Sequence, residues 1–232
     1  MISQLITPAR IRGHEILDEL GLDPKLVVRS MHDVARANRF FGGSSAAVAE
    51  LAPVLSKTKG TITILDVGTG IGDITECARR KARKAGVSVL TVGLDSAAEL
   101  ASASRERHNA VVCGNALQLP FPDRSFDVVI GSQILHHFDD KSAIQFLSEL
   151  NRVARVRVII SEIRRSWLAV MGLWLGSFLL RFHPVSRHDG IVSIRRGFTC
   201  PELEDLVERA VGRTPEVTHR PLFRVTTGWT PA

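Results

Sequence analysis

A glycine-rich turn gives the first chemical signal in the sequence. The stretch ILDVGTGIGDI places Gly68, Gly70 and Gly72 directly after an apolar run that contains Asp66. Glycine lacks a Cβ, so this turn lets the backbone approach a ligand, and the helix expected next points its positive end at a negative group. A dinucleotide fingerprint needs a third glycine at position 73, where the chain has aspartate. Two ligands compete for this turn, a dinucleotide and an adenosyl sulfonium.

Further polar groups stand where later strands are expected to end. Asp95 closes the stretch VGLD, and a carboxylate there could accept hydrogen bonds from both hydroxyls of a ribose, as also happens in NAD sites. His136 and His137 follow the expected fourth strand, at the edge where open α/β sheets bind ligands. Either could take a proton from a phenol as it attacks. His188, beside Asp189 in an expected loop, is a third candidate base, although packing or surface position explains such histidines as well.

The elements that would position these residues alternate along the chain from Thr61. Short apolar runs alternate with longer amphipathic ones, a pattern typical of a parallel sheet with helices on both faces. A capping box at Thr199 and Glu202 predicts one more helix, and two strands are expected in the tail. The pattern therefore predicts a doubly wound α/β fold. We expect an N-terminal helical cap over residues 1–58 and a main domain over 59–232, with an apolar helical insertion at about 164–198.

Composition limits the functional classes. The 232 residues are 44% hydrophobic and carry a net charge of +6, but basic and acidic residues are interleaved, so nucleic acid is an unlikely partner. Cys77, Cys113 and Cys200 form no CxxC pair, and neither a disulfide framework nor a metal site is expected. The N-terminus lacks the pattern of a signal peptide, and the longest apolar stretch has too few residues to span a bilayer. A cytoplasmic protein is predicted.

Four segments in the expected order resemble a known enzyme family. LDVGTGIGDI, GLDSAAEL, GNALQLPFPDRSFDVVIGSQILHHFDD and LNRVARVRVIISEI together are similar to class I S-adenosylmethionine-dependent methyltransferases. They are most similar to the small-molecule branch (methyltransferase type 11) that includes the quinone-biosynthesis enzymes. The resemblance covers about residues 60 to 165. It implies a Rossmann-like sheet of seven strands, parallel with an antiparallel last strand.

The resemblance also assigns residues to the cofactor, S-adenosylmethionine, whose product would be S-adenosylhomocysteine. The glycine turn would hold the methionine part, Asp95 the ribose, and the residues after the second and third strands the adenine. The end of the fourth strand would lie near the transferred methyl group. The family often has aspartate where Asn115 stands, and asparagine keeps an acceptor while adding a donor. The implied cofactor contacts are Asp66, Gly68, Thr69, Gly70, Asp95, Ser96, Asn115, Ala116, Leu117, Ser132 and Gln133.

The apolar insertion falls where small-molecule methyltransferases commonly build substrate lids. Its large side chains recur at helical spacing and suggest a wall for a hydrophobic acceptor; Phe41 is a further candidate contact from the N-terminal part. Core packing, a dimer contact and a membrane-surface patch, helped by Arg164, Arg165 and Arg181, are alternatives. The candidate substrate contacts are Phe41, Trp167, Met171 and Trp174.

The function predicted from these features is transfer of a methyl group to an oxygen or carbon of a hydrophobic small molecule, such as a phenol, quinone precursor or polyketide. The protein is expected to be a monomer or a homodimer. A catalytically inactive binding or assembly protein that keeps the fold is the alternative from another class. An RNA methyltransferase is less favoured for two reasons. The fourth strand ends in GSQILHH rather than in the NPPY-like segment of many amino-group methyltransferases, and the sequence shows no aromatic-rich basic platform.

Overall fold

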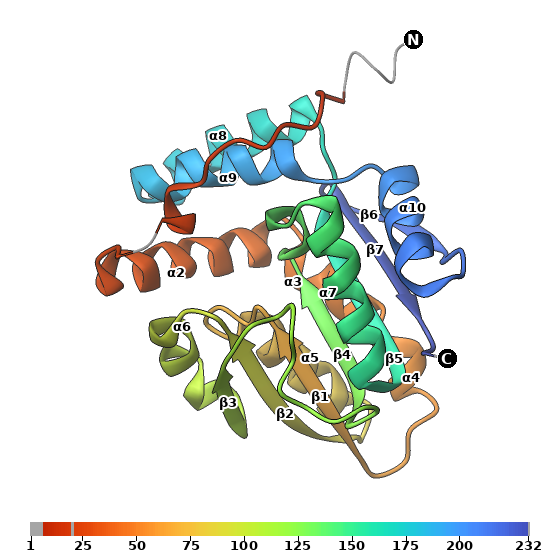
Figure 1. Cartoon of the computed structure of the whole chain (residues 1–232). Coiled ribbons are helices and arrows are strands. Elements are labelled where there is room, and N and C mark those ends of the chain that lie inside the picture. The colour runs from red at the N-terminus through yellow and green to blue at the C-terminus, as the bar shows by residue number, and fades with distance from the viewer. Residues whose placement is uncertain (1–6, 20, 232) are drawn as a thin grey trace.

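A single seven-stranded sheet forms the centre of the computed structural model, which describes residues 7–19 and 21–231 (Figure 1). The strands lie in the order β3-β2-β1-β4-β5-β7-β6, and only β7 runs antiparallel to its neighbours. The predicted doubly wound sheet with its antiparallel last strand is confirmed. The strands are β1 Thr61–Val67, β2 Ser88–Asp95, β3 Ala110–Cys113, β4 Phe126–Ser132, β5 Ala154–Ile163, β6 Val217–Arg220 and β7 Arg224–Trp229.

Helices cover both faces of the sheet because alternate strand residues point to opposite sides. In β1, Leu65 packs with α7 and α10 on one face, whereas Ile64 packs with α3, α4 and α5 on the other. Both side chains are fully buried, as expected for a parallel sheet covered twice. The covering helices are α3 Gly43–Ala49, α4 Ala52–Leu55, α5 Asp73–Lys84, α7 Asp140–Val153 and α10 Cys200–Val211.

The remaining helices gather at the carboxyl ends of the strands. Figure 1 shows α2 crossing above that edge, with α8 and α9 side by side beyond it. The extended segment 7–15 runs along α9, where Ile11 N–H donates to the Arg195 carbonyl. These elements are η1 Ile16–Asp18, α2 Pro24–Phe40, α6 Ala98–Ala103, η2 Arg105–Arg107, η3 Leu135–His137, α8 Trp167–Leu179 and α9 Pro184–Arg196.

Two predicted elements need comment. The capping box is present: Thr199 N–H donates to the Glu202 carboxylate at 2.7 Å, and α10 begins at Cys200. The loop predicted around His188 is wrong, because those residues belong to α9. Pro184 opens that helix at its first position, where a missing N–H costs nothing, and His183 caps it by accepting from Val185 N–H at 3.3 Å.

The boundary predicted at residue 58 stays a prediction. Within the predicted cap, α3 and α4 pack against the sheet itself through Ala47, Leu51 and Leu55. Of the described residues in that cap, only α2, η1 and the extended segment 7–15 lie over the strand ends. Among the described residues, no helix combines the length and hydrophobicity needed to cross a membrane.

Candidate active site

A cavity of about 1080 Å³ opens above the carboxyl ends of β1, β2 and β4. Its floor is the sheet edge, with Gly68, Gly70 and Asp95, and its far walls come from α2, α8 and α9. A typical pocket for one small ligand measures roughly 300–1000 Å³, so this volume holds two small molecules side by side. The cavity lies at the edge where ligands bind in open α/β sheets.

Two glycines let the backbone form the floor of this cavity. Gly68 and Gly70 have φ angles of 70° and 55°, in the left-handed region that favours glycine. A Cβ added to Gly68 would lie 2.5 Å from Cδ1 of Ile134, and one added to Gly70 would lie 2.9 Å from Cε of Met31. Both conformation and space therefore require glycine here.

Asp95 ends β2 beside the glycine turn and lines the cavity. Its Oδ2 accepts from Gly70 N–H at 2.9 Å, and its Oδ1 accepts from Ala97 N–H at 3.1 Å. Burial raises the pKa of Asp95, against the opposing effect of these N–H donors. Each carboxylate oxygen keeps a further lone pair, so the group fits a ligand that presents two hydroxyl donors.

The structure brings most of the implied cofactor residues to one place. Seven of them line the cavity: Gly68, Gly70, Asp95, Ser96, Asn115, Ala116 and Gln133. Asp66, Thr69, Leu117 and Ser132 are absent from the cavity wall. Leu117 packs instead against the core, and the Ser132 side chain is buried.

Asp66 supports the turn from behind and does not face the cavity. Its buried Oδ2 accepts from the hydroxyls of Thr69 at 2.9 Å and Thr75 at 2.7 Å. Thr69 Oγ1 also lies 2.9 Å from Nε2 of the buried His108. Burial raises the pKa of Asp66 to about 6. Both side chains point inward and hold the turn in place, and the contact of Asp66 and Thr69 with the cofactor remains a prediction.

His136 lies on the cavity wall and is held by a buried carboxylate. Its Nδ1 is 2.8 Å from Oε2 of Glu162, whose Oε1 accepts from Leu135 N–H at 2.7 Å. Despite full burial, which acts in the opposite direction, the charge and hydrogen bonds of His136 lower the pKa of Glu162. An ionised Glu162 accepts the Nδ1 proton of His136, which leaves Nε2 as the ring nitrogen available to a ligand.

His137 also lines the cavity, in a more charged setting. Its Nδ1 lies 3.0 Å from Asp18, and Glu15 is 4.0 Å from its Nε2. Burial lowers the pKa of His137, but Asp18 and Glu15 outweigh that effect and raise it. Arg196 donates to both carboxylates at 2.9 Å, so the group is a network of two cations and two anions when His137 is protonated.

Glu15, His136 and His137 could also hold a metal ion, since they offer ligand atoms within 4.8 Å of one another. Two histidines and one carboxylate form a known ligand set for divalent transition metals. Arg196, however, already occupies Oε1 of Glu15 and brings a permanent positive charge to the same place. That charge opposes a second cation, and the absence of a metal remains a prediction.

His188 and the large side chains of α8 do not lie where the sequence suggested. His188 Nδ1 contacts Asp189 at 2.8 Å, but only Asp189 is on the cavity wall. Trp167, Met171 and Trp174 are 44%, 57% and 51% exposed and stand on the outer side of α8.

The inner face of α8 supplies the wall through Ala169, Gly172 and Leu173, and Leu168 lines the cavity at the border with the outer face. Helical periodicity predicted that the large side chains share one face of α8, but it did not predict whether that face points toward the cavity. Phe41, in contrast, lines the cavity as expected.

Sequence reasoning missed several charged residues at the site. Glu15 and Asp18 come from the extended segment and η1, which have no periodic pattern. Glu162 sits in the fully buried second half of β5, where a charged residue is unusual, a signal that could have marked it. Arg224, at the start of β7, is buried on the cavity wall and donates to Gln133 Oε1 at 2.8 Å. Burial lowers the pKa of Arg224 to about 10, and no described carboxylate forms an ion pair with it.

The residues present fit S-adenosylmethionine. The glycine floor admits a close ligand, Asp95 can accept ribose hydroxyls, and Ser96, Asn115 and Ala116 flank the adjacent space. The strand order, the cavity at the switch point and this cradle are the features expected of an S-adenosylmethionine-dependent methyltransferase.

Comparison with known proteins finds a methyltransferase domain in this chain. Residues 65–160 match the family model described as "Methyltransferase domain". A probable tRNA methyltransferase 9B of Bos taurus is 32% identical over 132 residues, covering 56% of this chain and 27% of that protein. The ubiquinone/menaquinone biosynthesis C-methyltransferase UbiE of Xanthomonas campestris pv. campestris is 36% identical over 117 residues, covering 45% and 44%.

The matches thus span less than half of either curated relative. Among solved structures, a SAM-dependent methyltransferase from Aquifex aeolicus superposes with a TM-score of 0.61. The superposition covers 91% of this chain and all of that one, at 17% identity, and supports the fold.

Proposed function

We propose that this protein transfers a methyl group from S-adenosylmethionine to an oxygen or carbon of a hydrophobic small molecule. The observation that carries the proposal is the contrast between the two ends of the cavity. The end at the sheet edge is glycine backbone and polar side chains, whereas the far walls are mainly apolar outside the charged group that includes Glu15, Asp18 and Asp189. The apolar lining residues include Leu17, Val27, Met31, Ile163, Leu173, Phe182 and Ile194.

This division suits a reaction between a polar cofactor and an apolar acceptor. S-adenosylmethionine supplies a methyl group on a positively charged sulfur, which becomes a neutral thioether when the acceptor bonds the methyl. The apolar walls hold the acceptor in line with that group and exclude water. Orientation of this kind can supply about 7–11 kcal/mol of the barrier lowering in favourable cases.

His136 is the residue that we assign to the acceptor's proton. If the acceptor is a phenol, its O–H proton passes to Nε2 of His136 as the oxygen bonds the methyl carbon. Glu162, at 2.8 Å from Nδ1, stabilises the imidazolium that forms and keeps the ring in place. His137 suits this role less, because the carboxylates of Asp18 and Glu15 lie 3.0 and 4.0 Å from its two ring nitrogens. His136 therefore takes precedence over His137 as base.

The relatives support two classes of acceptor. The Xanthomonas relative is named a quinone-biosynthesis C-methyltransferase, which agrees with the apolar cavity. The bovine relative is named a probable tRNA methyltransferase, so tRNA is the second candidate. The intact glycine floor and Asp95 argue against an inactive binding protein. A cytoplasmic location remains part of the proposal.

Two measurements on the full chain test this proposal. Calorimetry should show one site for S-adenosylmethionine, and a chain that binds none of it would overturn the assignment. Label transfer from methyl-tritiated cofactor should then be measured with simple phenols and quinols, and with total tRNA. Labelled phenol or quinol supports the proposal, whereas label only in tRNA would replace the small molecule with RNA.

A further inference from the structure

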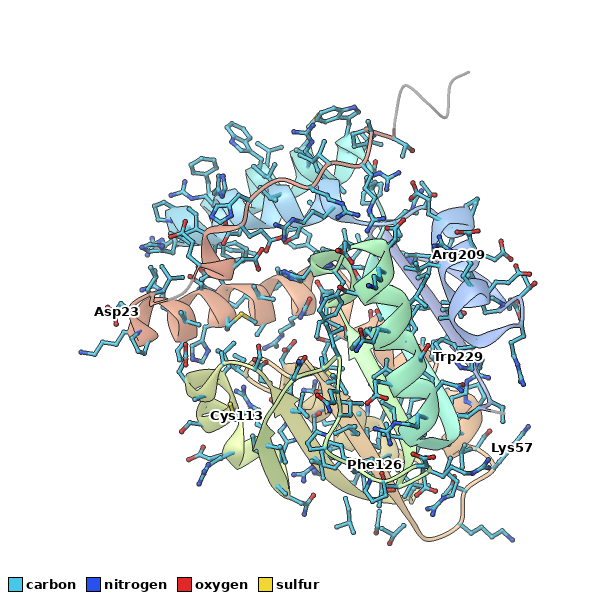
Figure 2. The ribbon with its side chains drawn as sticks, viewed as in Figure 1. Asp23, Lys57, Cys113, Phe126, Arg209 and Trp229 are labelled. Carbon is cyan, nitrogen blue, oxygen red and sulfur yellow. The ribbon has the colours of Figure 1, made fainter. Side chains whose placement is uncertain are left out.

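The outer face of α8 is an exposed apolar surface. Seven large side chains, spaced as one face of a helix, are between 44% and 85% exposed. Figure 2 shows side chains of α8 standing out from the molecule, away from the sheet. Contiguous apolar patches of this kind mark interaction sites in proteins that are otherwise polar outside. The members of this α8 face are Trp167, Leu168, Met171, Trp174, Leu175, Phe178 and Leu179.

Arginines without acidic partners border the α8 face. Arg187 lies 4.5 Å from the ring centre of Phe178, and Arg195 lies 5.7 Å from that of Trp167. Arg164 precedes α8 and Arg181 follows it. Within the described chain, none of these four forms an ion pair with a carboxylate. Residues 164–198 contain six arginines and only one acidic residue, Asp189, which is buried.

The other two arginines are already engaged, which corrects one expectation from the sequence. Arg165 is buried and donates to both oxygens of Glu202 at 2.8 Å, so it is unavailable to an outside partner. Arg196 pairs with Glu15 and Asp18 in the site. Four arginines without a carboxylate partner thus remain as a positive rim: Arg181 is exposed, and Arg164, Arg187 and Arg195 are half-buried.

We propose that the α8 face docks on an anionic lipid membrane surface. Tryptophan side chains favour the membrane interface, and basic residues bind anionic headgroups. The helix has 13 residues, about 20 Å in length, so it can lie in the interface but not span about 30 Å of hydrocarbon. A second copy of the chain fits less well, because a twofold contact on this face would set the arginine rims against each other.

Docking would also bring the cavity to the membrane. Leu168 and Leu222 both line the cavity, and both are about half exposed, at 51% and 52%. The cavity therefore reaches the surface beside the α8 face. This step rests on the proposed function: a cavity opening at the membrane lets a hydrophobic acceptor pass from the bilayer into the site without crossing water.

Sedimentation with vesicles tests the docking. The full chain should bind vesicles of phosphatidylcholine mixed with phosphatidylglycerol, and bind phosphatidylcholine alone much less. Two of the three tryptophans, Trp167 and Trp174, lie on the α8 face, while Trp229 is buried. Tryptophan emission should therefore shift to shorter wavelength on binding. The double variant Arg187→Gln, Arg195→Gln should lose about fivefold in affinity for each arginine.

Matched variants separate docking from general stickiness. Met171→Glu should abolish most vesicle binding, whereas Leu90→Glu, at a residue 50% exposed on β2, should leave it unchanged. Absence of wild-type binding at low salt would overturn the proposal, as would equal binding by the two variants. A dimer that Met171→Glu disperses would assign the face to a second copy instead. Cofactor binding without vesicles is independent, so loss of docking alone leaves the proposed methyl transfer standing.

Discussion

Replacing Gly68 with alanine tests the glycine floor most sharply. At a φ of 70° an L side chain costs about 1–2 kcal/mol. The added Cβ would also lie 2.5 Å from Cδ1 and 3.2 Å from Cβ of Ile134, an overpacking that costs about 1–3 kcal/mol. We expect Gly68→Ala to lower the free energy of unfolding by about 2–5 kcal/mol. The methyl group also borders the cavity floor, so affinity for S-adenosylmethionine should fall by about tenfold or more.

Gly86→Ala is the matched control for this variant. Gly86 has a φ of 72°, but a Cβ there would meet no atom within 4 Å. Gly86→Ala should therefore lower the free energy of unfolding only by the conformational cost, about 1–2 kcal/mol, and its affinity for S-adenosylmethionine should not change. Urea unfolding gives the stabilities and calorimetry gives the affinities. Equal losses of unfolding free energy in the two variants, or unchanged cofactor affinity of Gly68→Ala, would refute the close approach of the ligand to the backbone at Gly68.

Three further predictions concern the site. Burial raises the pKa of Asp66 from 3.8 to about 6, so the folded chain binds this proton more tightly than the unfolded chain and loses stability as pH rises between those values. The free energy of unfolding of Asp66→Asn, relative to that of the wild type, should therefore rise by up to about 3 kcal/mol from acid to neutral pH. Urea unfolding at several pH values measures this difference, and a difference that stays constant with pH would contradict the prediction. His136→Gln should lower turnover of a phenolic acceptor by about 10²–10⁴-fold without changing cofactor affinity, and His137→Gln should lower it far less; the reverse order in steady-state rates would exchange their roles. Dialysis against a chelator should leave turnover unchanged, since Arg196 already neutralises Glu15; activity that returns only with added metal would show a metal site.

Much of the fold was predictable because its signals are local. The apolar runs that become β1 and β4 are buried on both faces, and the turn at Gly68 follows from residue types that only a close ligand or a tight turn requires. The capping box at Thr199 similarly needs only three residues of separation. Such features depend on neighbours in sequence, so one sequence reveals them.

The walls of the site were less predictable because they depend on distant contacts. Which face of α8 points inward is decided by how α8 packs on α9, as with Leu173 against Gly190. Asp189 accepts from Ile16 N–H and Leu17 N–H across more than 170 residues, and so brings Glu15 and Asp18 to the histidines. Helix periodicity shows which residues share a face but not which element that face contacts. The extended segment 7–15 has no periodicity.

A crystal structure of the full chain with S-adenosylhomocysteine tests the central claim most directly. The account predicts the ribose hydroxyls on the Asp95 carboxylate and the amino-acid end against the backbone at Gly68 and Gly70. A nucleoside bound elsewhere, or an Asp95 side chain with no contact to the ribose, would contradict it.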